Sequence, residues 1–129
     1  MVYWIFVISD TEAEFKKRME KKEWPIFSFT ANRQKLKEGD GIVFYQAGIG
    51  GQKFLGQAEV ASKIKKEEDK IDYFVGMKDV KVWKNHVEMH PLINSLDFIG
   101  DKNAWGRHMQ GGVRKLSRKD FTTIIKEAT

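Results

Sequence analysis

The chain has 129 residues, no cysteine and a net charge of +5, with 41% hydrophobic and 32% charged residues. This length predicts one domain, residues 1–129, with a core that needs no disulfide or metal to fold. The lack of cysteine excludes a disulfide framework, a thiol nucleophile and cysteine-ligated zinc. No apolar run is long enough to cross a bilayer, and residues 2–8 lack the features of a secretory signal, so we expect a cytoplasmic protein.

The chain opens with a continuous apolar run, VYWIFVI at residues 2–8, which predicts a strand buried on both faces. A helix is expected from about residue 10 to residue 22. Ser9 and Glu12 fit a capping box at its start, and the spacing of Phe15 and Met19 directs both side chains to the core.

The next stretch, EWPIFSFTANRQKLKEGD at residues 23–40, is unusual because four large apolar side chains crowd together without a helical or strand period. These are Trp24, Ile26, Phe27 and Phe29. The stretch then turns polar and basic. We therefore expect an aromatic loop, followed by a turn at KEGD.

The middle of the chain reads as strands, and its C-terminal part adds short helices. Residues 41–47 and 52–64 predict a hairpin joined by a flexible GIGG connector, with either a bulge or a close approach of another backbone at Gly56. After a charged loop, one long strand or a strand pair is expected. That strand or strand pair covers residues 72–83. It is followed by a short helix at 90–96, a strand at 113–116 and a helix at 117–128 capped by Ser117. This order predicts an α+β fold, in which a small curled sheet or barrel is flanked by helices.

Charge is unevenly distributed along the chain. Residues 100–129 hold seven basic and three acidic side chains, whereas residues 41–99 hold eight of each. The basic excess favours a surface that faces a polyanion. A lysine-rich solvated surface explains the same composition, and the two interpretations stay open.

A search for catalytic patterns favours no enzyme. GIGG lacks the Gly-Lys-Ser/Thr of a phosphate-binding loop, and no serine has the surroundings of a nucleophile. In an extended chain, HVEMH would place His86, Glu88 and His90 on one face, a weak metal pattern that incidental surface histidines explain better. Asp10 follows the first strand, where it either contacts a ligand or caps the helix. We expect no catalytic residue, no metal and no cofactor.

The order of segments carries a resemblance to a known family. YWIFVIS, a helix, EW with NRQ, LKEGDGIVFY and then FLGQAEVAS resemble the EVE domain family of PUA-like proteins. The tail, HPLINSLDFIG followed by VRKLSRKDF, is similar to the archaeal branch. The resemblance covers nearly the whole chain and implies a PUA-like small mixed β-barrel with flanking α-helices. EVE domains are similar to YTH domains, which bind a modified base in an aromatic cage, so it also implies binding of RNA or DNA through a modified or flipped base.

The resemblance assigns residues to the implied site. Trp24 matches the family's loop tryptophan, and Asn32 and Gln34 match an N-x-Q element. The expected base contacts are Ser9, Asp10, Trp24, Phe27, Ser28, Asn32 and Gln34. The expected phosphate contacts are Arg33, Arg107, Arg114 and Lys115. No second cage tryptophan occurs between residues 65 and 73, so either Tyr73 or Phe74 substitutes or the pocket is half-open. The alternative function is a small-molecule or nucleotide-binding domain that uses the same pocket without nucleic acid.

Overall fold

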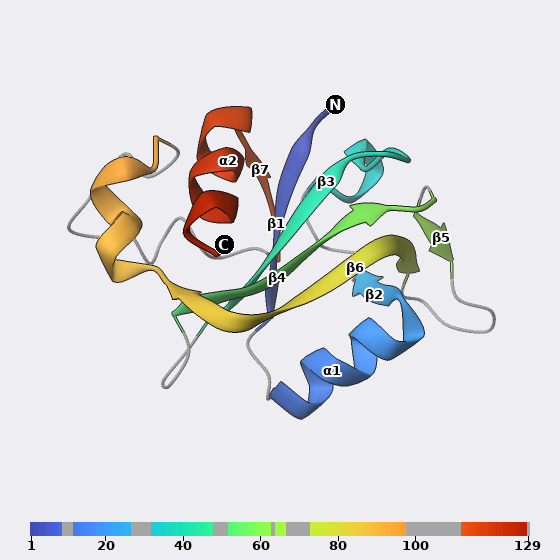
Figure 1. The fold of residues 1–129 in the computed structure, drawn as a ribbon. Helices are drawn as coiled ribbons and strands as arrows, with labels where there is room; N and C mark the ends of the chain where they lie inside the picture. Colours follow the sequence, from blue (N-terminus) through green and yellow to red (C-terminus); the bar gives the residue numbers. More distant parts are fainter. Residues whose placement is uncertain are drawn as a thin grey trace.

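The computed structural model describes residues 1–8, 12–26, 32–47, 52–62, 64–66, 73–97 and 112–128, with the side chains of Arg33 and Lys66 outside that description. Within these residues, strands form most of the regular structure, and the helices α1, α2, η1 and η2 accompany them (Figure 1). In chain order, the elements are β1 (Tyr3–Ile8), α1 (Glu12–Lys21), β2 (Glu23–Ile26), η1 (Arg33–Lys35), β3 (Gly41–Gln46), β4 (Lys53–Val60), β5 (Lys65–Lys66), β6 (Tyr73–Glu88), η2 (His90–Ser95), β7 (Val113–Leu116) and α2 (Arg118–Glu127).

The described strands form one seven-stranded sheet in the order β2-β6-β4-β3-β1-β7, with β5 paired to β6. The central strands β1 and β3 run parallel, with Tyr3 opposite Gly41, and the other pairs are antiparallel. The long strand β6 bends along its length, so that the sheet curls in Figure 1. The predicted mixed, curled sheet with flanking helices is confirmed.

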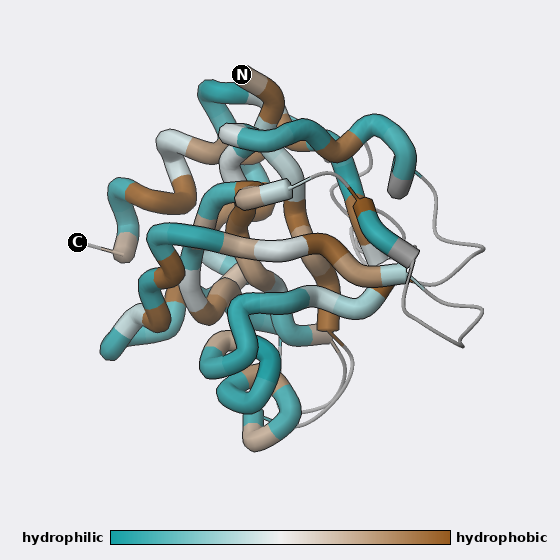
Figure 2. Tube along the Cα trace, turned by 90° about the vertical axis from the view of Figure 1, so that its right-hand side faces the viewer, coloured by the Kyte–Doolittle hydropathy of each residue, from teal (hydrophilic) through white to brown (hydrophobic). Residues whose placement is uncertain are grey.

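Each face of the sheet carries its own core, because side chains alternate along the strands. The inner face, which bears Trp4 and Phe6 of β1, packs against α1 and β2. The outer face, which bears Ile5 of β1, packs against η2 and α2. Figure 1 shows α1 and α2 on opposite sides of the sheet. Figure 2 shows that the hydrophobic segments concentrate in the central strands, whereas α1 is hydrophilic along most of its length.

The turn before β3 is held by a buried acidic side chain. Asp40 is 4% exposed, and its carboxylate accepts three hydrogen bonds. The donors are the Trp4 indole Nε1 at 2.9 Å and the backbone N–H groups of Lys37 at 3.1 Å and Val2 at 3.2 Å. A buried carboxylate is stable only when such partners satisfy it. Asp40 therefore fixes the start of β3 against β1.

Several local predictions are confirmed. The side chain of Ser117 caps α2 by accepting a hydrogen bond from the backbone N–H of Asp120 at 3.1 Å. Gly56 lies at a register shift between β4 and β6, and a Cβ atom there would clash with the backbone carbonyl oxygen of Lys81. The strand predicted at 72–83 is one long strand, β6, that continues to Glu88.

The prediction of a loop around Trp24 is wrong. Residues Glu23–Ile26 form β2, which pairs antiparallel with β6 and places Trp24 opposite Val75. Pro25 is compatible with this strand because β2 lies at the edge of the strand order, where a missing N–H breaks no ladder. Only Trp24 and Ile26 alternate with other residues in this four-residue strand, and so short a pattern does not distinguish a strand from a loop.

Candidate functional site

The predicted base-contact residues fall into two groups. Ser9, Asp10, Phe27 and Ser28 lie outside the described residues, as does the predicted phosphate contact Arg107. The structure describes Trp24, Asn32, Gln34, Arg114 and Lys115, and the backbone of Arg33.

The structure describes the end of β1 at Ile8, together with the strand ends beside it. The carboxyl ends of β1 and β3 meet, because the backbone N–H of Ala47 donates to the carbonyl oxygen of Ile8 at 2.8 Å. The start of β7 joins them, since the N–H of Val7 donates to the carbonyl oxygen of Gly112 at 2.8 Å. Ligands of sheet proteins often bind beside the carboxyl ends of parallel strands. In the sequence, Ser9 and Asp10 follow β1 directly.

Trp24 lies in the inner core. Its side chain is 3% exposed, and its ring stacks on Phe44 with centroids 5.1 Å apart and an interplanar angle of 29°. Phe6 lies 5.6 Å away, centroid to centroid, and the guanidinium carbon of Arg18 lies 4.6 Å from the indole centroid. Contact with a base would need neighbouring side chains to move, and the base contact expected of Trp24 stays a prediction.

Asn32 connects the segment before η1 to β7. Its backbone is left-handed, with φ at 65°, a conformation that asparagine tolerates better than most residues. Its side-chain Nδ2 donates to the carbonyl oxygen of Val113 at 3.2 Å, and its own carbonyl accepts from the N–H of Lys35. Gln34 follows on η1 with an exposed side chain. The structure thus gives Asn32 a positioning role, and its contact with a base edge stays a prediction.

The two predicted phosphate contacts on β7 do not form one cluster. Arg114 pairs with Ile5 of β1, and Lys115 pairs with Trp4. Because Ile5 and Trp4 point to opposite faces of the sheet, Arg114 and Lys115 do too. Lys115 is exposed, and Arg114 is half-buried on the side of the outer face.

Sequence reasoning missed a groove along α1. Two apolar side chains, Pro25 and Phe74, line it beside Lys17, Arg18 and Lys21, together with Glu14 and Glu23. We call this groove of about 190 Å³ the α1 groove. The guanidinium of Arg18 pairs with Glu14 at 3.2 Å and lies over Trp24. The spacing of Lys17 and Lys21, four apart on a helix, was the available signal.

The HVEMH segment, residues 86–90, is not extended along its whole length, as the weak metal pattern would require. His86 and Glu88 lie on β6, but His90 begins η2, so the three residues do not share one extended strand. His90 Nε2 lies 3.2 Å from Gln52 Oε1. Desolvation lowers the pKa of His86, and Lys53, which pairs with Glu12 at 3.3 Å, lowers it further. Among the described residues, no three histidine, aspartate or glutamate side chains gather as a metal site would require.

The chain matches one known protein family over nearly its whole length. The sequence model of the EVE domain matches residues 2–127. UPF0310 protein PH1033 of the archaeon Pyrococcus horikoshii is 27% identical, over 98% of each chain.

Solved structures show the same fold. Human THYN1, solved in complex with DNA containing 5-methylcytosine, has a TM-score of 0.65 and 12% identity, over 99% of this chain and 98% of its own. The YTH domain of Zygosaccharomyces rouxii MRB1, solved with N6-methyladenosine RNA, has a TM-score of 0.64 and 18% identity, over 98% and 87%. In the described part of this chain, no helix has the length and apolar character of a membrane span.

Proposed function

This chain belongs to the EVE domain family, and we propose that it binds nucleic acid and recognises a modified or flipped base. The observation that carries the proposal is the fold match to human THYN1 and to the MRB1 YTH domain. Both were solved with nucleic acid that contains a methylated base, one DNA and one RNA. The proposal covers both kinds of nucleic acid, because these two relatives differ in that respect.

The α1 groove supports the proposal with its residue types. Lys17, Arg18 and Lys21 offer three cationic side chains next to the apolar surfaces of Pro25 and Phe74. Cationic side chains contact phosphates, and aromatic faces stack on unpaired bases, so the groove matches the surface that single strands need. Glu14 and Glu23 lower its net positive charge, which favours a few phosphate contacts over a long track.

The energetics explain why a pocket is also needed. Removing a base from its stack costs a few kcal/mol, which the protein must return through stacking and hydrogen bonds to the base edge. One stacking contact returns about 1–3 kcal/mol. We assign the edge contacts to Ser9, Asp10 and Ser28, and the aromatic wall to Phe27, because Trp24 is already packed in the core. The hydrogen bond from Asn32 to Val113 ties the start of η1, which comes after Phe27 and Ser28 in the sequence, to β7.

Fluorescence anisotropy tests the proposal with four labelled single strands. They are DNA with and without 5-methylcytosine and RNA with and without N6-methyladenosine, each measured at two salt concentrations. We expect one modified strand to bind more tightly than its unmodified counterpart and the affinity of both to fall with salt. Each phosphate contact on a single strand contributes a slope of about −0.7 in log K against log salt.

A charge-matched pair of variants tests the α1 groove. Lys17→Gln with Lys21→Gln should make the slope shallower by about 1.4 if both lysines contact phosphates. The control is Lys78→Gln with Lys84→Gln, which removes two exposed lysines of β6 and should leave the slope unchanged. If no strand binds better than a dye control, the proposal is wrong. Tight binding of a free nucleoside without salt dependence would favour the nucleotide-binding alternative.

A further inference from the structure

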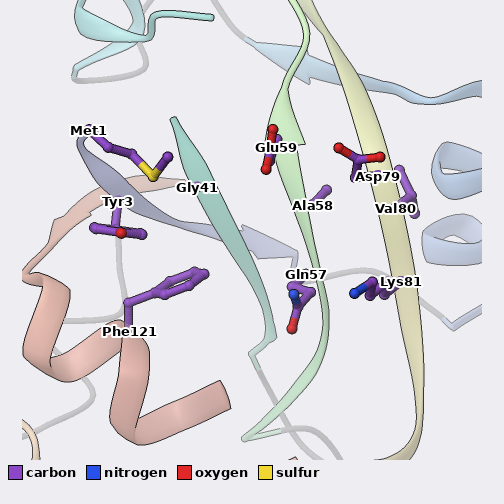
Figure 3. Close-up of a pocket in the computed structure, with 10 residues that line it drawn as sticks. All are labelled: Met1, Tyr3, Gly41, Gln57, Ala58, Glu59, Asp79, Val80, Lys81 and Phe121. Carbon is purple, nitrogen blue, oxygen red and sulfur yellow. The ribbon is translucent and has the colours of Figure 1, made fainter. Parts of the chain in front are cut away.

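A second groove lies on the outer face of the sheet, at the end of β1 that bears Tyr3 and away from Ile8 (Figure 3). Tyr3 lines this groove, and Ile8 lies at the other end of β1, about 16 Å away along the extended chain. The groove has a volume of about 440 Å³, within the range of small-molecule sites. Its lining includes Tyr3, Gly41, Glu59, Asp79 and Phe121, and we call it the outer groove.

One wall of the outer groove is aromatic. The rings of Tyr3 and Phe121 pack together with centroids 4.4 Å apart and an interplanar angle of 33°. Gly41 lies opposite Tyr3 on β3, and a Cβ atom there would be 2.6 Å from Cδ1 of Tyr3. Glycine therefore lets the Tyr3 ring lean over β3, toward β4. Both rings are only partly buried, so part of their surface faces the groove.

The other wall carries two carboxylates. Glu59 lies opposite Gly41 in the pairing of β3 with β4. Asp79 lies in a bulge of β6, where the register shifts and its φ is 52°, a left-handed value that aspartate adopts at a cost. In Figure 3, both side chains lie toward one end of the groove, and Lys81 points toward Gln57. No lysine or arginine of the described chain lies within salt-bridge distance of either carboxylate.

The two walls lie at a suitable separation for one compact cation. Tyr3 and Glu59 lie two strand spacings apart, or about 10 Å between their backbones, and the strand between them has no side chain at Gly41. A cation is attracted to an aromatic face within about 6 Å of the ring centroid, and it also contacts a carboxylate directly. A partly apolar wall favours a weakly hydrated cation over a strongly hydrated one.

We propose that the outer groove binds the alkylated ammonium group of a small organic cation, held between the Tyr3–Phe121 rings and the Glu59 and Asp79 carboxylates. Lys81 also lines the groove and repels a cation, so the ligand occupies the end nearest Glu59 and Asp79. The outer groove is separate from the α1 groove, because it lies on the outer face, whereas α1 packs against the inner face.

The test is a titration of the full chain, followed by NMR, with choline and with its neutral counterpart 3,3-dimethylbutan-1-ol. Choline should shift the amide signals of Tyr3, Gly41 and Glu59 and saturate. The neutral alcohol should bind at least about fivefold more weakly, since it lacks the charge. Methylammonium, which is more strongly hydrated, should also bind more weakly than choline.

Isosteric variants test the acidic wall. Glu59→Gln with Asp79→Asn should weaken choline binding by about fivefold, and asparagine tolerates the left-handed backbone at position 79. Lys81→Gln should tighten binding by about twofold. Glu20→Gln, at an exposed position of α1, removes one carboxylate away from the groove and serves as the control, which should change nothing. Equal binding of choline and the neutral alcohol, absence of saturable choline binding, or an unchanged affinity in the double variant would each overturn the proposal.

Discussion

Replacing Trp24 with alanine should destabilise the fold severely. The indole is 3% exposed and packs against Phe6, Phe44 and the guanidinium of Arg18. Truncating a buried tryptophan to alanine costs about 3–5 kcal/mol, because it removes apolar contacts and leaves a cavity. The close aromatic pairing and the Arg18 contact place Trp24 toward the upper end of this range.

This cost predicts a measurable loss of thermal stability. For a chain of 129 residues, an unfolding entropy of ~2.1 cal/mol/K per residue gives ~270 cal/mol/K in total. A loss of 3–5 kcal/mol then lowers Tm by about 11–18 °C. Differential scanning calorimetry of the wild type and Trp24→Ala gives this shift directly.

Two further variants make the result interpretable. Trp83→Ala removes a half-buried tryptophan of β6 and should cost only about 1–2 kcal/mol. Trp24→Phe keeps an aromatic ring in the core and should recover most of the lost stability. If Trp24→Ala instead melts within about 4 °C of the wild type and loses binding of the modified strand, the core assignment is wrong and Trp24 is the base platform.

Two other predictions concern buried polar groups. Asp40→Ala should lower the free energy of unfolding by about 3 kcal/mol, because the Trp4 indole and two backbone N–H groups lose their acceptor. Asp40→Asn keeps one acceptor oxygen and should cost less in the same urea titration; equal costs would contradict the reasoning. Burial raises the pKa of the Tyr45 phenol, so the unfolded chain releases this proton first and the free energy of unfolding falls as pH rises above about 10. Tyr45→Phe should remove that part of the fall, and an unchanged pH slope in the variant would show that Tyr45 does not contribute.

Much of the fold was predictable from the sequence, because it depends on local signals. The apolar run of β1, the turn at Asp40, the bulge at Gly56 and the cap at Ser117 each follow from residue type and spacing, and each is present. The strand at Trp24 was not predictable in this way. It pairs with β6, about fifty residues later in the chain, and no local pattern specifies that partner.

The candidate site was less predictable, since it depends on which face of the sheet each side chain occupies. Arg114 and Lys115 are adjacent in the sequence and look there like one basic cluster. In the strand, their side chains point to opposite faces of the sheet. Conversely, the α1 groove brings Lys17 and Lys21 together with Phe74, which lies far away in the sequence. Neither the separation of Arg114 from Lys115 nor the approach of Phe74 to α1 can be predicted without knowing which strands pair.

The position of the aromatic residues changes how selectivity must arise. Trp4, Phe6, Trp24 and Phe44 all belong to the inner core, so packing accounts for these four rings before any ligand is considered. Affinity and selectivity should then reside in different residues. Lys17 and Lys21 reach any phosphate, so their loss should weaken every strand by a similar factor. The polar residues that follow β1 and β2 face a base edge under the proposal, so changes there should alter the ratio of modified to unmodified binding instead.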